Sequence, residues 1–299
     1  RLVGSEMCIR DSPDALRTEL AAVPGLRLLS QPEELERLSR DAYDYSPVLS
    51  QRLAYCRAEL VVRPDSVEAV VRVAAACRRH AVPLTLRGSG TGNYGQSVPL
   101  ESGVVMVMTQ LRAVRSIDQA SGVAEVECGC LLKDLNRELA GFGRQLRLMP
   151  STWRSATIGG FIAGGSGGIG SVRWGFLRDP RHLLGLEVVT MEQEPRVLQL
   201  EACDAEALNH AYGTNGIITA LRLATAVRVD WQEVVVDCPD LPTAVELARR
   251  CSSAAIDLHL CTVLEAAVVE LLPTWDLPPR RSDRLLPVSY THLTLPTKA

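Results

Sequence analysis

Two stretches of the sequence are dense in glycine and small polar residues, and the first has the composition of an anion-binding loop. Its glycines recur nearly every second residue, which permits positive φ angles and lets backbone N–H groups converge without a Cβ in the way. The serine, threonine and asparagine between them add side-chain hydrogen bonds. A pyrophosphate is the expected ligand, and a mobile surface loop is the alternative. The stretch consists of Arg87, Gly88, Ser89, Gly90, Thr91, Gly92, Asn93, Tyr94, Gly95 and Gln96.

Two common nucleotide motifs do not explain this stretch. Residues 90–95 and 165–170 both fit the pattern GxGxxG, but a dinucleotide-binding loop must open a helix that faces the phosphates. Gly95 instead leads into Gln-Ser-Val-Pro, which favours extended chain. No lysine follows either glycine run, so a triphosphatase P-loop is excluded.

The second stretch covers residues 150–179 and begins with Pro150, Ser151 and Thr152. We expect Thr157 to begin a short helix in which Gly159 and Gly160 allow close packing against a flat partner. A second backbone-lined rim follows this helix. The alternative is tight helix packing followed by a flexible loop. The rim consists of Gly164, Gly165, Ser166, Gly167, Gly168, Gly170 and Ser171.

The elements that must position these stretches are strands and helices in irregular order. Asp65 is expected to cap a helix, with Glu68 three residues on, and apolar residues at helical spacing continue it to residue 80. A short strand at residues 82–86 then leads into the first glycine stretch. Further strands are expected at residues 104–108, 124–127, 183–190, 196–200 and 217–229, and further helices at residues 131–140 and 204–212. Because these elements do not alternate regularly, the sequence predicts an α+β fold rather than a doubly wound sheet.

The pattern of elements divides the chain into five parts. Residues 1–12 and 288–299 resemble translated sequencing adapters, and the first of these lacks the apolar core of a signal peptide. Residues 13–56 form a lead-in, with an irregular surface segment expected at residues 41–47. Residues 57–229 form the main domain. Residues 230–287 are expected to be the start of a truncated second domain, with a strand at residues 234–236 and a helix at residues 241–250.

Composition narrows the classes of partner. The 299 residues are 46% hydrophobic and 22% charged, with a net charge of −3, which gives no reason to expect nucleic acid or an anionic membrane as a partner. Nine cysteines lack metal-site spacing, so we expect no metal and a reducing cytoplasm. The longest run of small and apolar residues is mostly glycine and alanine and lacks the roughly 20 apolar residues of a membrane span.

Five motifs occur in a characteristic order across residues 60–225. They are VRPDSVEAV at 62–70, PLTLRGSGTG at 83–92, ATIGG at 156–160, WGFLRD followed by LGLEVV at 174–189, and GTNGIIT at 213–219. Together they resemble the FAD-linked oxidases of the vanillyl-alcohol oxidase and p-cresol methylhydroxylase (PCMH) superfamily, and among them the FAD subunit of glycolate oxidase. The resemblance implies a PCMH-type FAD-binding domain of two subdomains, followed by a substrate domain.

The resemblance also implies roles for individual residues. The first glycine stretch corresponds to the loop that wraps the FAD pyrophosphate. Pro150, Ser151, Thr152, Thr157, Ile158, Gly159, Gly160 and the rim at residues 164–171 correspond to the segment along the ribityl chain and the isoalloxazine. Gly216, Ile217 and Ile218 correspond to the adenine side. Several members bind the flavin covalently through a histidine where this sequence has Thr91. Since neither segment contains histidine or cysteine, we expect non-covalent FAD.

The implied activity is oxidation of a small alcohol or 2-hydroxy acid by hydride transfer to flavin N5, with oxygen or a carrier as electron acceptor. The catalytic base is expected in the second domain and remains unassigned. Arg173, Trp174 and Tyr212 are candidates to line the flavin face, with surface exposure of the arginine and core packing of the aromatic residues as the alternative. His182, His210 and His259 are most simply explained as structural or surface side chains. Two alternatives are a flavin-binding partner subunit of an oxidase complex and a structural protein without cofactor. The sequence is compatible with an oligomer or with a subunit of a complex, whether the protein is an enzyme or a partner subunit.

Overall fold

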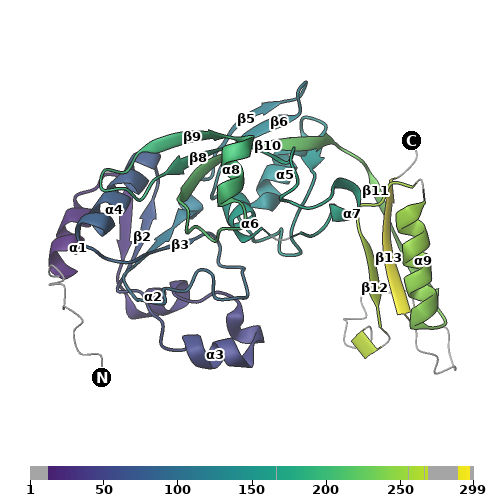
Figure 1. The fold of residues 1–299 in the computed structure, drawn as a ribbon, viewed down its shortest axis with the longest axis horizontal. Coiled ribbons are helices and arrows are strands. Elements are labelled where there is room, and N and C mark those ends of the chain that lie inside the picture. The colour runs from purple at the N-terminus through teal and green to yellow at the C-terminus, as the bar shows by residue number, and fades with distance from the viewer. Residues whose placement is uncertain (1–12, 166, 255, 266, 269–288, 297–299) are drawn as a thin grey trace.

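The computed structural model describes residues 13–165, 167–254, 256–265, 267–268 and 289–296. Figure 1 shows a large unit built on two sheets and a smaller unit, on the right, that contains β11, β12, β13 and α9. Helices and strands follow one another in irregular order, and the α+β class predicted from the sequence is confirmed. No helix in the described part of the chain combines the length and the apolar character needed to cross a membrane.

The first sheet carries the strand that enters the first glycine stretch. The strand order is β1-β2-β4-β3, with β2, β3 and β4 parallel and β1 antiparallel to β2. All four residues of β4 are buried, as expected for a central parallel strand between covering layers. The strands are β1 (Leu26–Leu29), β2 (Leu60–Pro64), β3 (Leu84–Arg87) and β4 (Val104–Val107).

Helix α4 (Val67–Arg79) connects β2 to β3 and packs against α1 (Pro13–Ala21). Its cap differs from the sequence prediction: Ser66, not Asp65, is the N-cap and accepts a hydrogen bond from the Ala69 N–H. Asp65 lies instead in the turn toward β1, where its N–H donates to the Gly25 carbonyl at 3.0 Å. The tertiary contact with β1 therefore decides which of two adjacent capping residues is used.

The lead-in predicted at residues 13–56 is an integral part of the first sheet, because β1 pairs with β2 along its whole length. The segment expected to be irregular surface is partly buried: Asp41 is 8% exposed and Tyr43 is 1% exposed. Tyr43 packs with Leu53 and Val98 in a small apolar cluster beside the glycine stretch. This part of the chain contains α2 (Pro32–Leu38), the 3₁₀ turn η1 (Tyr43–Tyr45) and α3 (Pro47–Leu53).

The second sheet is antiparallel and supports the second glycine stretch. Its strand order is β5-β6-β10-β8-β9, and β7 pairs with the far end of β10. Helix α5 (Leu132–Ala140) follows β6, and α6 (Ile158–Gly164) is the helix predicted at Thr157. The strands are β5 (Val114–Asp118), β6 (Val123–Glu127), β7 (Arg144–Leu146), β8 (Leu183–Val189), β9 (Val197–Glu201) and β10 (Ile217–Val227).

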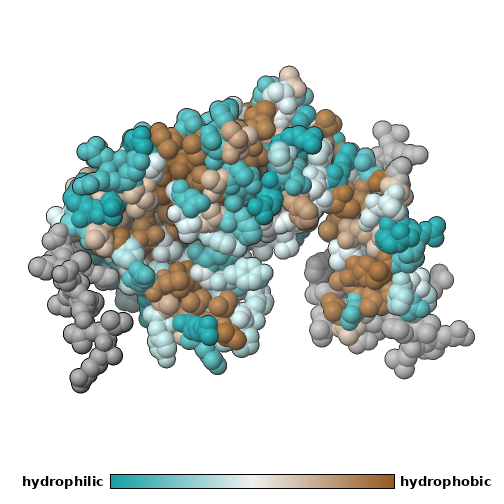
Figure 2. Space-filling view, viewed as in Figure 1, coloured by the Kyte–Doolittle hydropathy of each residue, from teal (hydrophilic) through white to brown (hydrophobic). Residues whose placement is uncertain are grey.

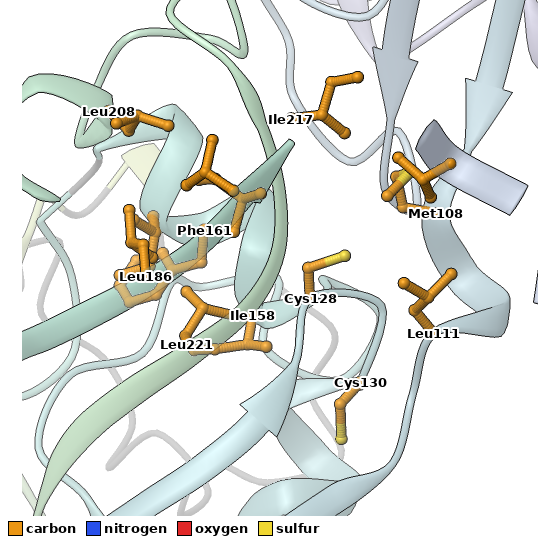
Figure 3. Packing of buried hydrophobic residues seen from close by; sticks show 14 of the residues in the cluster. Met108, Leu111, Cys128, Cys130, Ile158, Phe161, Leu186, Leu208, Ile217 and Leu221 are labelled. Atoms are coloured by element: carbon orange, nitrogen blue, oxygen red, sulfur yellow. The ribbon is translucent and has the colours of Figure 1, made fainter. Parts of the chain in front are cut away.

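One hydrophobic core joins the two sheets. Figure 3 shows Phe161 and Ile158 of α6 beside Leu186 of β8 and Leu221 of β10, and Met108 and Cys128 belong to the same cluster. The turn η2 (Met108–Gln110) follows β4. Short α7 (Ser171–Trp174) follows α6. The helix predicted at residues 204–212 is wrong in extent: α8 (Ala202–Ala205) and the turn η3 (Glu206–Leu208) end before His210, which has a left-handed backbone.

The smaller unit begins with β11 at Trp231, and the domain boundary expected near residue 230 stays a prediction. Its strand order is β11-β13-β12, and helix α9 packs against all three strands. Strand β13 consists of residues that the sequence suggests are adapter-derived, and the origin of that segment stays a prediction. Figure 2 shows hydrophilic side chains interspersed among the hydrophobic ones over the larger unit. The elements are β11 (Trp231–Cys238), α9 (Leu241–Ser253), β12 (Cys261–Leu264) and β13 (Ser289–Pro296).

Candidate cofactor site

The first glycine stretch leaves the end of β3 as a loop. No helix follows Gly95; the chain runs through turns to Leu100, so the dinucleotide-motif interpretation of residues 90–95 does not fit the structure. Gly90 and Gly95 have φ angles of +71° and +80°. A Cβ at Gly90 would overlap the Arg87 guanidinium. Glycine at this position therefore lets the loop fold over its own arginine.

The two glycine stretches touch each other. A Cβ on Gly88 would overlap the Thr157 hydroxyl, so the loop can approach α6 only because residue 88 is glycine. Thr157 is the N-cap of α6 and accepts a hydrogen bond from the Gly160 N–H at 3.3 Å. At the other side of α6, a Cβ on Gly159 would lie 2.6 Å from Cys128 Cβ. Glycines therefore pack α6 between the loop and the end of β6.

A cavity of about 360 Å³ lies between these elements, within the range of about 300–1,000 Å³ typical of small-molecule sites. Both glycine stretches and the start of β10 contribute to its wall. Apolar side chains form one part of the wall, among them Met108, Cys128, Phe161 and Ile218. Met108 begins the turn η2 after β4, and Cys128 follows the last residue of β6 (Figure 3).

The electrostatics of the wall favour an anion. Arg87 is the one charged side chain among the described residues that line the cavity, and it is 7% exposed. Burial lowers the pKa of its guanidinium, and nearby Asp41 opposes that shift. An arginine stays protonated at any physiological pH even so. A buried cation under a glycine-rich loop, beside an apolar surface, matches a ligand that has both phosphates and a planar ring.

Comparison with known proteins decides which ligand this is. A family model described as an FAD binding domain matches residues 58–197, the part of the chain that contains both glycine stretches. Residues 58–197 are an FAD-binding domain of the FAD-linked oxidase superfamily. FAD is the cofactor of this domain, and the predicted family resemblance is confirmed.

Relatives of the FAD-binding domain carry names of oxidases and dehydrogenases. The chain is 31% identical over 201 residues to the glycolate oxidase subunit GlcD of Escherichia coli, covering 64% of this chain and 38% of that protein. It is 25% identical over 252 residues to the mitochondrial D-2-hydroxyglutarate dehydrogenase of Bos taurus, covering 80% of this chain and 44% of that protein. The chain thus spans less than half the length of either protein.

A solved structure supports the fold. The chain superimposes on an alkyldihydroxyacetonephosphate synthase with a TM-score of 0.79 at 19% sequence identity, covering 96% of this chain and 60% of that one. At this identity the likeness concerns the fold alone, and it agrees with the predicted PCMH-type architecture.

Most of the residues proposed from the sequence line the FAD-binding domain's cavity. Those from the first stretch surround one end, those from the second stretch lie along α6, and two lie at the start of β10. They are Arg87, Gly88, Ser89, Gly90, Thr91, Gly92, Asn93, Tyr94, Gln96, Pro150, Ser151, Thr152, Thr157, Gly159, Gly160, Gly164, Gly216 and Ile218.

Eight proposed residues lie outside the cavity wall for identifiable reasons. The side chains of Ile158 and Ile217 are buried in the hydrophobic core and not in the cavity wall; they are 2% and 1% exposed. Gly165 is the left-handed residue after α6 and packs against His210. The rest of the rim folds toward the Met149 backbone, to which Ile169 makes an isolated bridge. The residues outside the wall are Gly95, Ile158, Gly165, Gly167, Gly168, Gly170, Ser171 and Ile217, and Ser166 lies outside the described residues.

The cavity also has wall residues that the sequence patterns did not single out. They come from β3, from α6 and from turns and loops beside the two sheets, and the apolar ones look like ordinary core residues. Only Cys128 carries a reactive group, and burial raises the pKa of its thiol to about 12. These additional wall residues are Leu86, Ser97, Met108, Cys128, Ala156, Phe161, Ala163 and Gly213.

The histidines considered in the sequence do not line the cavity. His182 Nε2 lies 3.0 Å from the Trp174 carbonyl, and His259 stacks on Trp231 with ring centroids 4.9 Å apart. His210 Nε2 lies 2.9 Å from the hydroxyl of Tyr212, which does line the cavity. In the described part of the chain no group of three or more metal-ligating side chains is arranged to hold an ion.

Proposed function

We propose that this chain is the flavin domain of an FAD-dependent oxidoreductase that oxidises a small 2-hydroxy acid. The observation that carries the proposal is the single cavity that joins a phosphate-type glycine loop, a buried cation and an apolar wall. The names of the relatives supply the substrate class, since glycolate and D-2-hydroxyglutarate are both 2-hydroxy acids.

Two groups of residues would hold the cofactor, one at its phosphates and one at its ring. The loop at residues 88–93 would bind the phosphates through backbone N–H groups, with Arg87 supplying positive charge beneath them. Met108, Cys128, Phe161 and Ile218 would exclude water from the ring. The chemistry that bound FAD supplies is acceptance of a hydride from the carbon that carries the hydroxyl; the hydroxyl proton leaves to a base and a 2-oxo acid is the product. We place that base in the second domain, as the resemblance implies.

The experiment that tests this proposal is an anaerobic absorbance assay. Because we place the base in the second domain, the protein used is the chain extended to a complete second domain; it is reconstituted with FAD, desalted, and mixed with glycolate, D-lactate or D-2-hydroxyglutarate, with a simple alcohol as comparison. Loss of the flavin band with a 2-hydroxy acid and not with the alcohol is expected. A colourless desalted protein contradicts the assignment of the site. Dithionite serves as the control that the bound flavin is reducible.

One alternative has an observation of its own. The Escherichia coli relative is named as a subunit of glycolate oxidase, and we therefore keep a flavin-binding subunit of a larger complex as the second candidate. A protein that holds reducible flavin, but whose flavin no hydroxy acid reduces, favours this second candidate. The cytoplasmic location and the electron acceptor, oxygen or a carrier, stay predictions.

A further inference from the structure

Asp41 is a buried acid that the proposed function does not use. It belongs to the lead-in, in the segment between α2 and η1, and it is 8% exposed. Its Oδ1 accepts a hydrogen bond from the Tyr43 N–H at 3.0 Å, while Oδ2 is buried without a hydrogen-bond partner. A carboxylate buried in this way needs compensating charge or dipoles nearby.

Apart from the Tyr43 N–H, the compensating groups belong to the cofactor loop or directly follow it. Burial raises the pKa of the Asp41 carboxyl, and the backbone N–H groups of Ser97 and Gly95 and the charge of Arg87 oppose that shift. Asp41, Arg87 and Gly90 also line one pocket, so the carboxylate of the lead-in lies beside the arginine that begins the first glycine stretch.

Two further contacts join the same segments. The Ala42 N–H donates to the Gly92 carbonyl at 2.7 Å. The Arg87 guanidinium donates to the Arg40 carbonyl at 2.5 Å and to the Ser97 hydroxyl at 3.3 Å. Because the guanidinium also packs directly under Gly90, residues 40–42 hold the arginine and the loop in one arrangement.

We propose that Asp41 is a positioning residue of the cofactor site, which holds Arg87 and the glycine loop in the conformation that binds the FAD diphosphate. The inference rests on the proposed role of this loop. Asp41 acts through Arg87 and the loop backbone and does not line the cofactor cavity. A loop arranged before binding loses less conformational freedom when the ligand arrives, and affinity rises accordingly.

The test compares Asp41→Asn with Asp44→Asn. Asparagine keeps an oxygen that can accept from Tyr43 and removes the charge. Asp44 lies three residues on in the same segment and is exposed, so its variant is the matched control. FAD affinity is measured on the apoprotein by quenching of flavin fluorescence, and the thermal unfolding midpoint is measured in parallel. We expect FAD affinity to fall about tenfold in Asp41→Asn and to stay unchanged in Asp44→Asn.

A double-mutant cycle separates positioning from general stability. If Asp41 acts through Arg87, Asp41→Asn causes little further loss of FAD affinity in an Arg87→Met background. Additive losses overturn the proposal. So does a lowered unfolding midpoint with unchanged FAD affinity, because that is the result of a purely structural role.

A milder variant covers the case in which Asp41→Asn does not fold. Ser97→Ala removes only one acceptor of the Arg87 guanidinium and is expected to lower FAD affinity about threefold; unchanged affinity in a folded Ser97→Ala protein then overturns the inference. A wild-type chain that binds no FAD overturns the proposed function and this inference together. Wild-type binding with an unaffected, folded Asp41→Asn overturns this inference alone.

Discussion

Gly88 and Thr157 lie in direct contact, so the two glycine stretches of the FAD-binding domain meet at one point. The contact joins the loop that follows β3 to the residue that caps α6. A side chain at Gly88 must displace either the loop or the cap, and both line the cofactor cavity.

Gly88→Ala is expected to lower FAD affinity about tenfold, which corresponds to about 1.4 kcal/mol. Adding Thr157→Ala removes the overlapping hydroxyl and is expected to restore part of that affinity, although loss of the N-cap costs about 1 kcal/mol of stability. Fluorescence titration with FAD measures the affinity of the single and of the double variant. Gly167→Ala is the control, because a Cβ there meets only Ser171 Oγ at 3.7 Å. Equal losses in Gly88→Ala and in the double variant would contradict the contact.

Local patterns predicted the elements around this contact well. Thr157 was expected to begin a helix, and it caps α6. The strand before the first glycine stretch, the helix at residues 131–140 and the long strand from Ile217 lie within a few residues of the predicted positions. Each of these rests on spacing within a short window, where hydrophobic period and capping residues are informative.

The missed features depend on contacts between distant segments. Asp41 and Arg87 are 46 positions apart in the sequence, and nothing near Asp41 shows that it becomes buried. Cys128 follows a strand whose alternation looks ordinary, yet its side chain reaches the cavity because Gly159 lets α6 pack directly on it. Tertiary packing decides such positions, and a single sequence carries no local signal for them.

Cys128 bears on how FAD is retained. The sequence predicts non-covalent FAD from the absence of histidine and cysteine in the two stretches, and the structure adds a cysteine to the cavity wall. With a pKa raised to about 12 its thiol is protonated at neutral pH, and the thiol form is a poor nucleophile. Acid precipitation is therefore expected to leave all flavin in the supernatant, for the wild type and for Cys128→Ser alike. Flavin in the wild-type pellet that Cys128→Ser releases would show the expectation to be wrong.

Tyr212 forms part of the cavity wall with a left-handed backbone, φ +52°, and its hydroxyl contacts His210. Tyr212→Phe keeps the ring and loses one solvent-accessible hydrogen bond, so FAD affinity is expected to change by about twofold or less. Tyr212→Ala removes the ring and is expected to weaken FAD binding about fivefold. Tyr55→Ala is a control at a tyrosine that is 92% exposed. A larger loss in Tyr212→Phe than in Tyr212→Ala would mean that the hydroxyl, not the ring, contributes to binding.

Glu187 connects strands of the second sheet through its carboxylate. Its ionisation is expected to make the stability of the sheet depend on pH. Its carboxylate accepts from Arg115 at 3.0 Å and from the Thr219 hydroxyl at 2.9 Å. Burial raises the pKa of Glu187, but hydrogen bonds from Arg115, Thr219 and Gln199 outweigh burial and hold it below the ordinary value of 4.5. The stabilisation is thus present above pH 4.5 and is lost as the pH falls through the lowered pKa of the folded state.

Glu187→Gln is expected to reduce the free energy of unfolding by about 1 kcal/mol near neutral pH. The difference from wild type should shrink as the pH falls below 4.5 and through the lowered pKa of the folded state, because protonated glutamate resembles glutamine in charge. Urea unfolding across this pH range measures it. Glu125→Gln is the matched control, since its oxygen lies 3.4 Å from the same arginine and is more exposed; its effect should be smaller. A difference that stays constant with pH would mean that Glu187 stabilises the sheet by packing rather than by charge.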